Sequence, residues 1–155
     1  MRLFEFIDPI PCYYHGSTIP NLKILKRQPS KLTDEGVVFA ATMPEIAIAM
    51  SGHWTDDDFS FGHDTSRKHP DLVFPPYIMR ELRQNAFRKF FQQKMYIYEV
   101  PAKYFQKHEN LQDFEVVSYT DVPIHTMIKV DGVDDPLAYI KNSPIFRLIA
   151  YGNKE

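Results

Sequence analysis

The sequence predicts an α+β fold, and three observations carry that prediction. Twelve prolines are spread along the 155 residues, which favours many short elements over a few long helices. Apolar β-prone runs outnumber segments with helical spacing. The two kinds of segment follow one another in a mixed order, whereas a doubly wound parallel sheet would alternate them strictly. We expect one domain over residues 1–155.

Composition narrows the class of protein. The chain is 44% hydrophobic and 25% charged with a net charge of -2, which argues against a uniformly basic nucleic-acid-binding surface. Its one cysteine, Cys12, excludes an internal disulfide framework and favours a reducing compartment. The first eleven residues lack the features of a signal peptide, and no apolar run approaches the roughly 20 residues of a membrane span. We therefore expect a cytoplasmic protein without a membrane partner.

The first half of the chain contains the clearest local pattern. Residues 12–15 predict a strand that ends at His15 before a glycine turn, and the polar residues 23–33 predict a connection. Residues 36–41 form a continuous apolar run, typical of a strand buried on both faces. Thr42-Met43-Pro44-Glu45 follows as a capping-box pattern, with Thr42 as the cap of a short helix over residues 44–50.

The second half predicts one long loop, one basic helix and several short elements. Residues 51–75 lose periodicity and predict a lid or binding loop. Residues 76–93 have roughly helical apolar spacing and predict a basic amphipathic helix that carries Arg80, Arg83, Arg88 and Lys89. The remaining expected elements are strands at 95–100, 114–119, 124–130 and 145–151, a turn at 102–107 and a helix from 134 to 141.

Two short motifs could carry chemistry. In Tyr14-His15-Gly16-Ser17 a histidine at a strand end can hydrogen-bond a ligand, and the glycine lets that ligand approach the backbone; a plain strand end is the alternative. Glu115 heads a strand, where its carboxylate could stabilise a developing cation or act as a base; a solvated edge charge is the alternative. Glu99 is a rival carboxylate that we expect to face solvent.

Other polar groups give weaker signals. The loop histidines and aspartates match no metal-site spacing, so we expect no metal; they are His53, His63, His69, Asp56, Asp57, Asp58 and Asp64. No phosphate-binding glycine motif is present. The basic face of residues 76–93 could contact nucleic acid or an acidic partner, although such faces are usually solvated.

The order of the motifs is more informative than each motif alone. Tyr14-His15-Gly16-Ser17, then Gly36-Val37-Val38-Phe39-Ala40 before a helix with Ala47, then Glu115-Val116-Val117-Ser118-Tyr119 resembles the ADP-ribosyltransferase superfamily of the diphtheria-toxin and poly(ADP-ribose) polymerase type. It is also similar to small bacterial and phage proteins with a YHGS, VFAT and YIYEV layout. The resemblance covers about residues 12–50 and 95–130, and it implies a split, mostly antiparallel β-core that holds NAD in a cleft.

The resemblance also implies roles for individual residues. His15 would hydrogen-bond the ribose hydroxyls of NAD, the Gly16 backbone would bind the nicotinamide amide, and Ser17 would support that contact. Glu115 would stabilise the oxocarbenium-like transition state that forms when nicotinamide leaves. NAD would then be the substrate, and no metal would be needed.

The sequence departs from the family where stacking aromatics are common, since it has Val38 and Ala49 there. Tyr13, Tyr14, Phe39 or Trp54 could supply the stacking instead. The leading hypothesis is an NAD-dependent mono-ADP-ribosyltransferase that modifies an acceptor macromolecule. The alternatives are a non-catalytic module that binds a nucleotide, ADP-ribose or a protein, and a nucleic-acid-directed enzyme similar to an RNA 2'-phosphotransferase.

Overall fold

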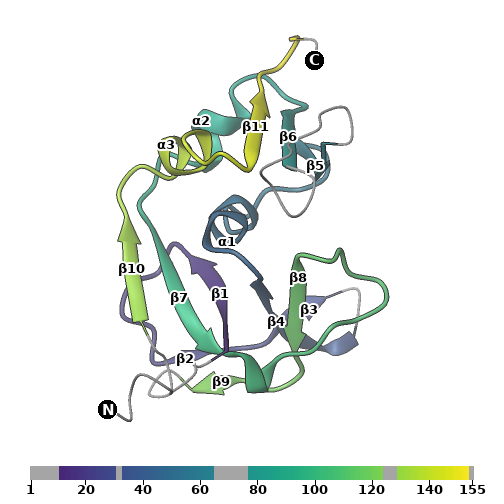
Figure 1. Cartoon of the computed structure of the whole chain (residues 1–155), viewed down its shortest axis with the longest axis vertical. Helices are drawn as coiled ribbons and strands as arrows, with labels where there is room; N and C mark the ends of the chain where they lie inside the picture. Colours follow the sequence, from purple (N-terminus) through teal and green to yellow (C-terminus); the bar gives the residue numbers. More distant parts are fainter. Residues whose placement is uncertain (1–10, 31–32, 65–76, 124–128, 154–155) are drawn as a thin grey trace, which may run out of the picture.

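The computed structural model describes residues 11–30, 33–64, 77–123 and 129–153, and its largest element is a six-stranded sheet (Figure 1). The strands lie in the order β10-β7-β1-β4-β3, with β8 also paired to β4, and every pairing is antiparallel. The six are β1 (Cys12–Ser17), β3 (Gln28–Ser30), β4 (Thr33–Ala41), β7 (Met95–Pro101), β8 (Glu115–Ser118) and β10 (Lys129–Val133).

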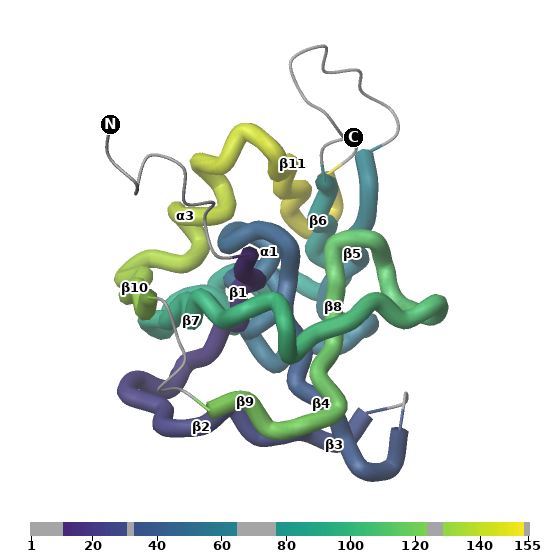
Figure 2. The backbone as a smooth tube through the Cα atoms, turned by 60° about the horizontal axis from the view of Figure 1, so that its bottom comes forward, coloured from purple at the N-terminus to yellow at the C-terminus, as the bar shows by residue number. Residues whose placement is uncertain are grey.

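Two smaller sheets accompany the main one. Strands β5 (Phe59–His63), β6 (Tyr77–Glu81) and β11 (Phe146–Ile149) form a three-stranded sheet in which β11 runs parallel to β6. Strands β2 (Ile24–Leu25) and β9 (Val122–Pro123) pair as a short antiparallel ribbon and lie side by side in Figure 2. The fold is therefore α+β and dominated by antiparallel sheets.

The helices are short. They are α1 (Pro44–Met50), α2 (Ala86–Phe90), α3 (Pro136–Lys141) and a 3-10 turn at Ala102–Tyr104. Within the described ranges no helix has the length and apolar character that a membrane crossing requires.

The main sheet is covered on both faces near its centre, whereas most residues of β3 and β10 are exposed. On one face α1 packs its Ile46 and Ile48 against Ala41 and Ile97, with the three-stranded sheet beyond the helix (Figure 1). On the other face Val38, Ala40 and Tyr98 pack against Leu25 of β2 and Val122 of β9. Successive residues of each strand alternate between the α1 face and the β2-β9 face.

Gly16 allows α1 to lie close to β1. A Cβ atom at Gly16 would lie 2.4 Å from the carbonyl oxygen of Ala47 and 2.8 Å from Cβ of Ser51, both distances too short for real contacts. Residue 16 must therefore be glycine for the helix to reach its observed position.

The main sheet is split between β1 and β4. Both strands lie wholly within the described residues, yet they are in register only where Tyr14 faces Ala41. By contrast β1 pairs with β7 along its whole length, from Cys12 to Ser17. The strand also runs two residues beyond the end predicted at His15.

The prediction of one long loop over residues 51–75 is wrong for the middle of that range, because Phe59–His63 forms β5. In that strand Phe59 and Phe61 face the aromatic core while Ser60 lies exposed between them. The turn before β5 is held by the buried Asp58, whose Oδ2 accepts from the Thr55 backbone N–H at 2.9 Å. Residues 65–75 lie outside the described part of the chain.

The basic helix predicted over residues 76–93 is also wrong. Tyr77–Glu81 is a strand, and only Ala86–Phe90 is helical. Asn85 has φ +64°, which interrupts a continuous helix. The buried Glu81 holds the turn, since its Oε2 accepts from the Phe87 N–H at 2.7 Å and its Oε1 from the Tyr151 N–H at 2.8 Å.

Several smaller expectations need correction. Helix α1 spans the predicted residues with Pro44 in its first turn, but its cap is Met43 and no side chain caps it. Residues 23–33 contain β2, β3 and the start of β4 as well as connections. Glu99, expected to face solvent, is half-buried and accepts a hydrogen bond from Cys12 Sγ at 3.1 Å. Of the strand predicted at 124–130, residues 124–128 lie outside the described part, and β10 begins at Lys129.

Candidate functional site

Glu115 lies in the wall of a cavity of about 360 Å³. It is the first residue of β8 and pairs with Ala41 of β4, so its side chain is on the α1 face of the sheet. The cavity lies between the end of α1, the strand β5 and the segment that enters β8. Its lining residues are Met50, Trp54, Asp56, Phe59, Ser60, Phe61, Gln112, Phe114 and Glu115.

Aromatic rings form much of the cavity wall. Trp54 is held in place by its indole N–H, which donates to the carbonyl of Ala49 at 2.7 Å, and its ring meets Phe59 edge-on at 5.3 Å. Phe61 meets Phe114 edge-on at 5.1 Å. The cavity is open to solvent, because Met50, Asp56, Ser60 and Gln112 in its wall are exposed.

The Glu115 carboxyl is the half-buried titratable group of this cavity. Burial raises its pKa above the ordinary value of 4.5, and the positive charge of Lys107 lowers it in part. Lys107 itself donates to the backbone carbonyl of Asp113, which lies just before β8. A partly desolvated carboxylate interacts more strongly with a nearby positive charge than one in bulk water does.

His15 lies at the split in the sheet. Its Nδ1 is 2.6 Å from the carbonyl oxygen of Phe39, and because a carbonyl only accepts, Nδ1 carries the proton. Burial lowers the pKa of His15, which favours the neutral ring. The other ring nitrogen, Nε2, is then an acceptor suited to a hydroxyl group. The imidazole thus adds a hydrogen bond from β1 to β4 beyond their one registered pair.

The remaining residues of the predicted site are distributed over both faces of the sheet. Tyr14 and Phe39 share the α1 face with Glu115, because Tyr14 pairs with Ala41 and Phe39 pairs with Val117. Burial raises the pKa of Tyr14 to about 12, so it remains a neutral donor. Ser17 lies on the opposite face with His15, and its Oγ accepts from the Ile19 N–H at 3.0 Å.

The structure therefore brings some predicted residues together and separates others. One row across three neighbouring strands consists of Tyr14, Ala41 and Glu115. At the usual spacing of strands, the backbones of Tyr14 and Glu115 are about 10 Å apart. His15 points to the other face and lies beside Tyr98, with ring centroids 6.4 Å apart. Among the aromatics proposed for stacking, Trp54 lines the Glu115 cavity.

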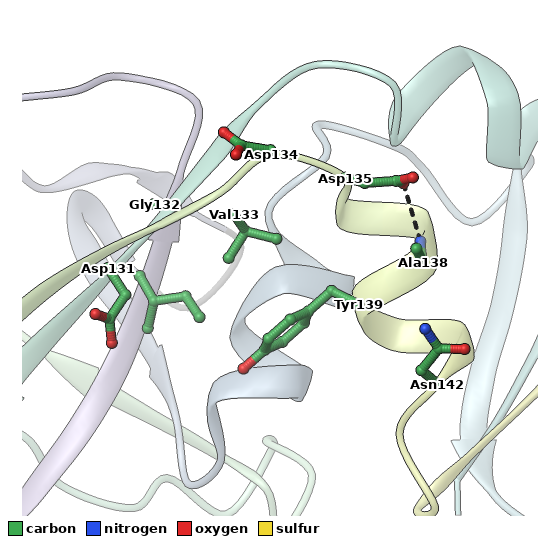
Figure 3. Close-up of a pocket in the computed structure, with 9 residues that line it drawn as sticks. Asp131, Gly132, Val133, Asp134, Asp135, Ala138, Tyr139 and Asn142 are labelled. Carbon is green, nitrogen blue, oxygen red and sulfur yellow. Dashed lines mark hydrogen bonds between the residues drawn. The ribbon is translucent and has the colours of Figure 1, made fainter.

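A second cavity, of about 440 Å³, contains none of the predicted site residues (Figure 3). It lies between β10 and α3, and its acidic groups serve local structure. Asp135 caps α3 by accepting from the Ala138 N–H at 3.0 Å, Asp134 pairs with Lys94 at 3.1 Å, and Asp131 pairs with Lys129 at 3.3 Å.

Sequence reasoning missed the side of the site that β5 builds. The signal was present, because Phe59-Ser60-Phe61-Gly62-His63 alternates large and small or polar residues after the turn-forming aspartates 56–58. What the sequence could not reveal is that this strand would face Glu115 from a different sheet.

The structure also places the residues that were considered for a metal site and for nucleic-acid binding. Among the described histidines, cysteines and acidic residues, no group of three is arranged to hold a metal ion. The nucleic-acid hypothesis rested on the helix at 76–93; Arg80 instead lies on β6, and Arg83 pairs with Asp58 at 3.4 Å and Asp57 at 3.7 Å.

Comparisons with family models, with curated proteins and with solved structures find no match to this chain.

Proposed function

We propose that this chain is an NAD-dependent mono-ADP-ribosyltransferase whose transition-state carboxylate is Glu115. The observation that carries the proposal is the half-buried Glu115 carboxylate in the wall of the aromatic-lined cavity. The family resemblance of the motifs and the split between β1 and β4 support it, because the resemblance implies a split antiparallel core.

The chemistry suits these groups. The bond between the ribose carbon and the nicotinamide nitrogen breaks, and its electron pair leaves with nicotinamide. Positive charge then develops on the sugar, where an ionised carboxylate stabilises it in a partly desolvated site. An acceptor nucleophile forms the new bond at the same carbon and releases its proton to solvent.

The role of His15 in this proposal is to orient NAD. Its neutral ring presents Nε2 as an acceptor for a ribose hydroxyl, while Nδ1 stays bound to the Phe39 carbonyl. Because His15 and Glu115 lie on opposite faces of the sheet, this role requires NAD to pass across the split between β1 and β4.

Nicotinamide release from NAD tests the proposal. Glu115→Gln keeps the size of the side chain but removes its charge, so we expect the rate to fall by about two to three orders of magnitude. Glu109→Gln is the matched control, because Glu109 is an exposed glutamate in the segment before β8. Calorimetry with millimolar NAD gives binding separately. Absence of NAD binding would refute the proposal, and equal turnover in wild type and Glu115→Gln would remove Glu115 from its role.

A second candidate function is a non-catalytic module that binds a nucleotide or ADP-ribose. The observation in its favour is that His15 and Glu115 lie on opposite faces of the sheet. Binding of ADP-ribose that weakens in His15→Ala, together with no nicotinamide release by the wild-type protein, would select this function over the transferase.

A further inference from the structure

Asp113 is held from two sides by residues of different elements. The last residue of β5 is His63, and its Nε2 lies 3.0 Å from the Asp113 carboxylate. Lys107, which follows the 3-10 turn, donates from its ammonium group to the backbone carbonyl of the same aspartate. These two contacts tie the segment of residues 107–113 to the three-stranded sheet, although the Asp113 side chain is exposed.

The His63 ring has a defined orientation. It stacks on Tyr77 with ring centroids 4.8 Å apart. Because a carboxylate only accepts, Nε2 carries the proton toward Asp113, and Nδ1 of the neutral ring is then an acceptor. Nδ1 is the one buried side-chain nitrogen or oxygen of the described residues that has no hydrogen-bond partner. An unpaired buried acceptor costs free energy, so the contacts with Asp113 and Tyr77 outweigh that cost and determine how the ring lies.

The held segment leads directly into Glu115. The Glu115 N–H donates to the Gln112 carbonyl at 3.1 Å, so the backbone turns tightly between Asp113 and Glu115. The ammonium group that binds the Asp113 carbonyl is thereby kept near the Glu115 carboxyl, and its positive charge acts on that carboxyl.

The charges around Glu115 give Lys107 a particular importance. Asp56 in the cavity wall and the Asp113 carboxylate are acidic, whereas Lys107 is basic. A nearby positive charge favours the ionised form of a carboxyl group, and burial or a nearby negative charge opposes it. The contact that fixes the Lys107 ammonium therefore bears on the charge of Glu115.

We propose that His63 is a positioning residue for Glu115. Through its bond to Asp113 it holds the Lys107 ammonium beside the Glu115 carboxyl and so supports the ionised form of that carboxyl. The inference deepens the proposed function, because a carboxylate that stabilises a developing cation has to be ionised. Only that consequence rests on the proposed function; the positioning itself follows from the contacts of His63, Asp113 and Lys107.

Carbon-13 NMR of the Glu115 carboxyl, assigned with Glu115→Gln, tests the positioning without any ligand. Lys107→Met removes the positive charge at nearly constant length, so the midpoint of the Glu115 titration should rise by about 0.5 pH unit or more. The same substitution is then combined with Asp113→Ala, or with His63→Phe, which keeps an aromatic ring beside Tyr77. In either background the rise caused by Lys107→Met should shrink to about half or less. Each rise is measured between two proteins of one background, so the direct effect of losing the Asp113 charge cancels.

Two controls separate the hydrogen bond from general loosening of the segment. Glu109→Ala is the matched control, because Glu109 is an exposed carboxylate of the same segment, and Lys107→Met should keep its full effect in that background. Asp113→Asn keeps an oxygen that accepts from His63 Nε2, so it should retain most of the effect that Asp113→Ala removes. Because the Asp113 side chain is exposed, Asp113→Ala should remain folded even if His63→Phe does not.

The titrations and the enzyme assay answer different questions. An equal rise after Lys107→Met in the wild-type, Asp113→Ala and His63→Phe backgrounds would overturn the positioning role. No rise in the wild-type background would overturn it as well, because the ammonium would then not act on Glu115. A wild-type protein that releases no nicotinamide would refute the proposed function, while the titrations would still decide the role of His63.

Discussion

Gly16→Ala provides a strong test of the packing between β1 and α1. The added methyl group would lie 2.4 Å from the Ala47 carbonyl oxygen, whereas ordinary contact begins at 3.4 Å, so the helix must retreat by about 1 Å. The obstacle is backbone and cannot rotate away. Ser51 adds to the crowding, and its Oγ is held by the Ile48 carbonyl at 2.9 Å.

We expect the variant to lose about 2–3 kcal/mol of unfolding free energy, the upper part of the range for overpacked cores. For a chain of this length that loss lowers the melting temperature by about 4–12 °C. Urea denaturation and thermal melts measure both quantities.

Gly62→Ala is the matched control, because Gly62 lies within a strand and a Cβ atom there would meet nothing within 4 Å. Its stability should stay within about 0.5 kcal/mol of the wild type. In the double variant Gly16→Ala with Ser51→Gly, only part of the loss should return, because the Ala47 carbonyl remains. Gly16→Ala as stable as Gly62→Ala would refute the claim that glycine is needed for helix packing.

Three further predictions concern the site and its supports. Folding raises the pKa of Glu115, so ionisation of this carboxyl group opposes folding. Relative to Glu115→Gln, the wild type should therefore lose stability as pH rises through the raised pKa. A stability difference in urea melts that does not change with pH would contradict this prediction. Folding lowers the pKa of His15, so the stability that its neutral ring contributes is full above about pH 6.5 and should decline as pH falls through the lowered pKa of the folded state. A stability difference between the wild type and His15→Ala that stays constant down to pH 4 would contradict this prediction. Tyr98→Phe removes the hydroxyl that donates to the Ile19 carbonyl at 2.5 Å and should cost about 1–2 kcal/mol, an expectation that an unchanged urea midpoint would reject.

Local patterns in the sequence predicted the elements that depend on local signals. The apolar run before Pro44 and the helix that follows it are observed at nearly the predicted residues. Strand β7 also matches, since its alternation and its terminal Pro101 are local features. For such segments burial and backbone preference favour the same structure.

The failures occurred where tertiary contacts override local spacing. Residues 77–81 carry apolar positions compatible with a helix, yet pairing with β5 and β11 makes them a strand. The site shows the same limit: the sequence indicates Glu115 because it heads a strand, but Trp54, Asp56 and Phe61 line the same cavity only because a second sheet packs there. Nor can motif order reveal that His15 and Glu115 face opposite sides.

The split between β1 and β4 has a consequence for the motions of the sheet. With one registered pair between these strands, the amides of β1 that face β4 have few ladder partners, whereas those that face β7 are paired along the strand. Hydrogen exchange along β1 should therefore alternate, with slow amides toward β7 and fast amides toward β4. A ligand that bridged the gap would slow the fast set selectively, and the exchange pattern would map its path across the two strands.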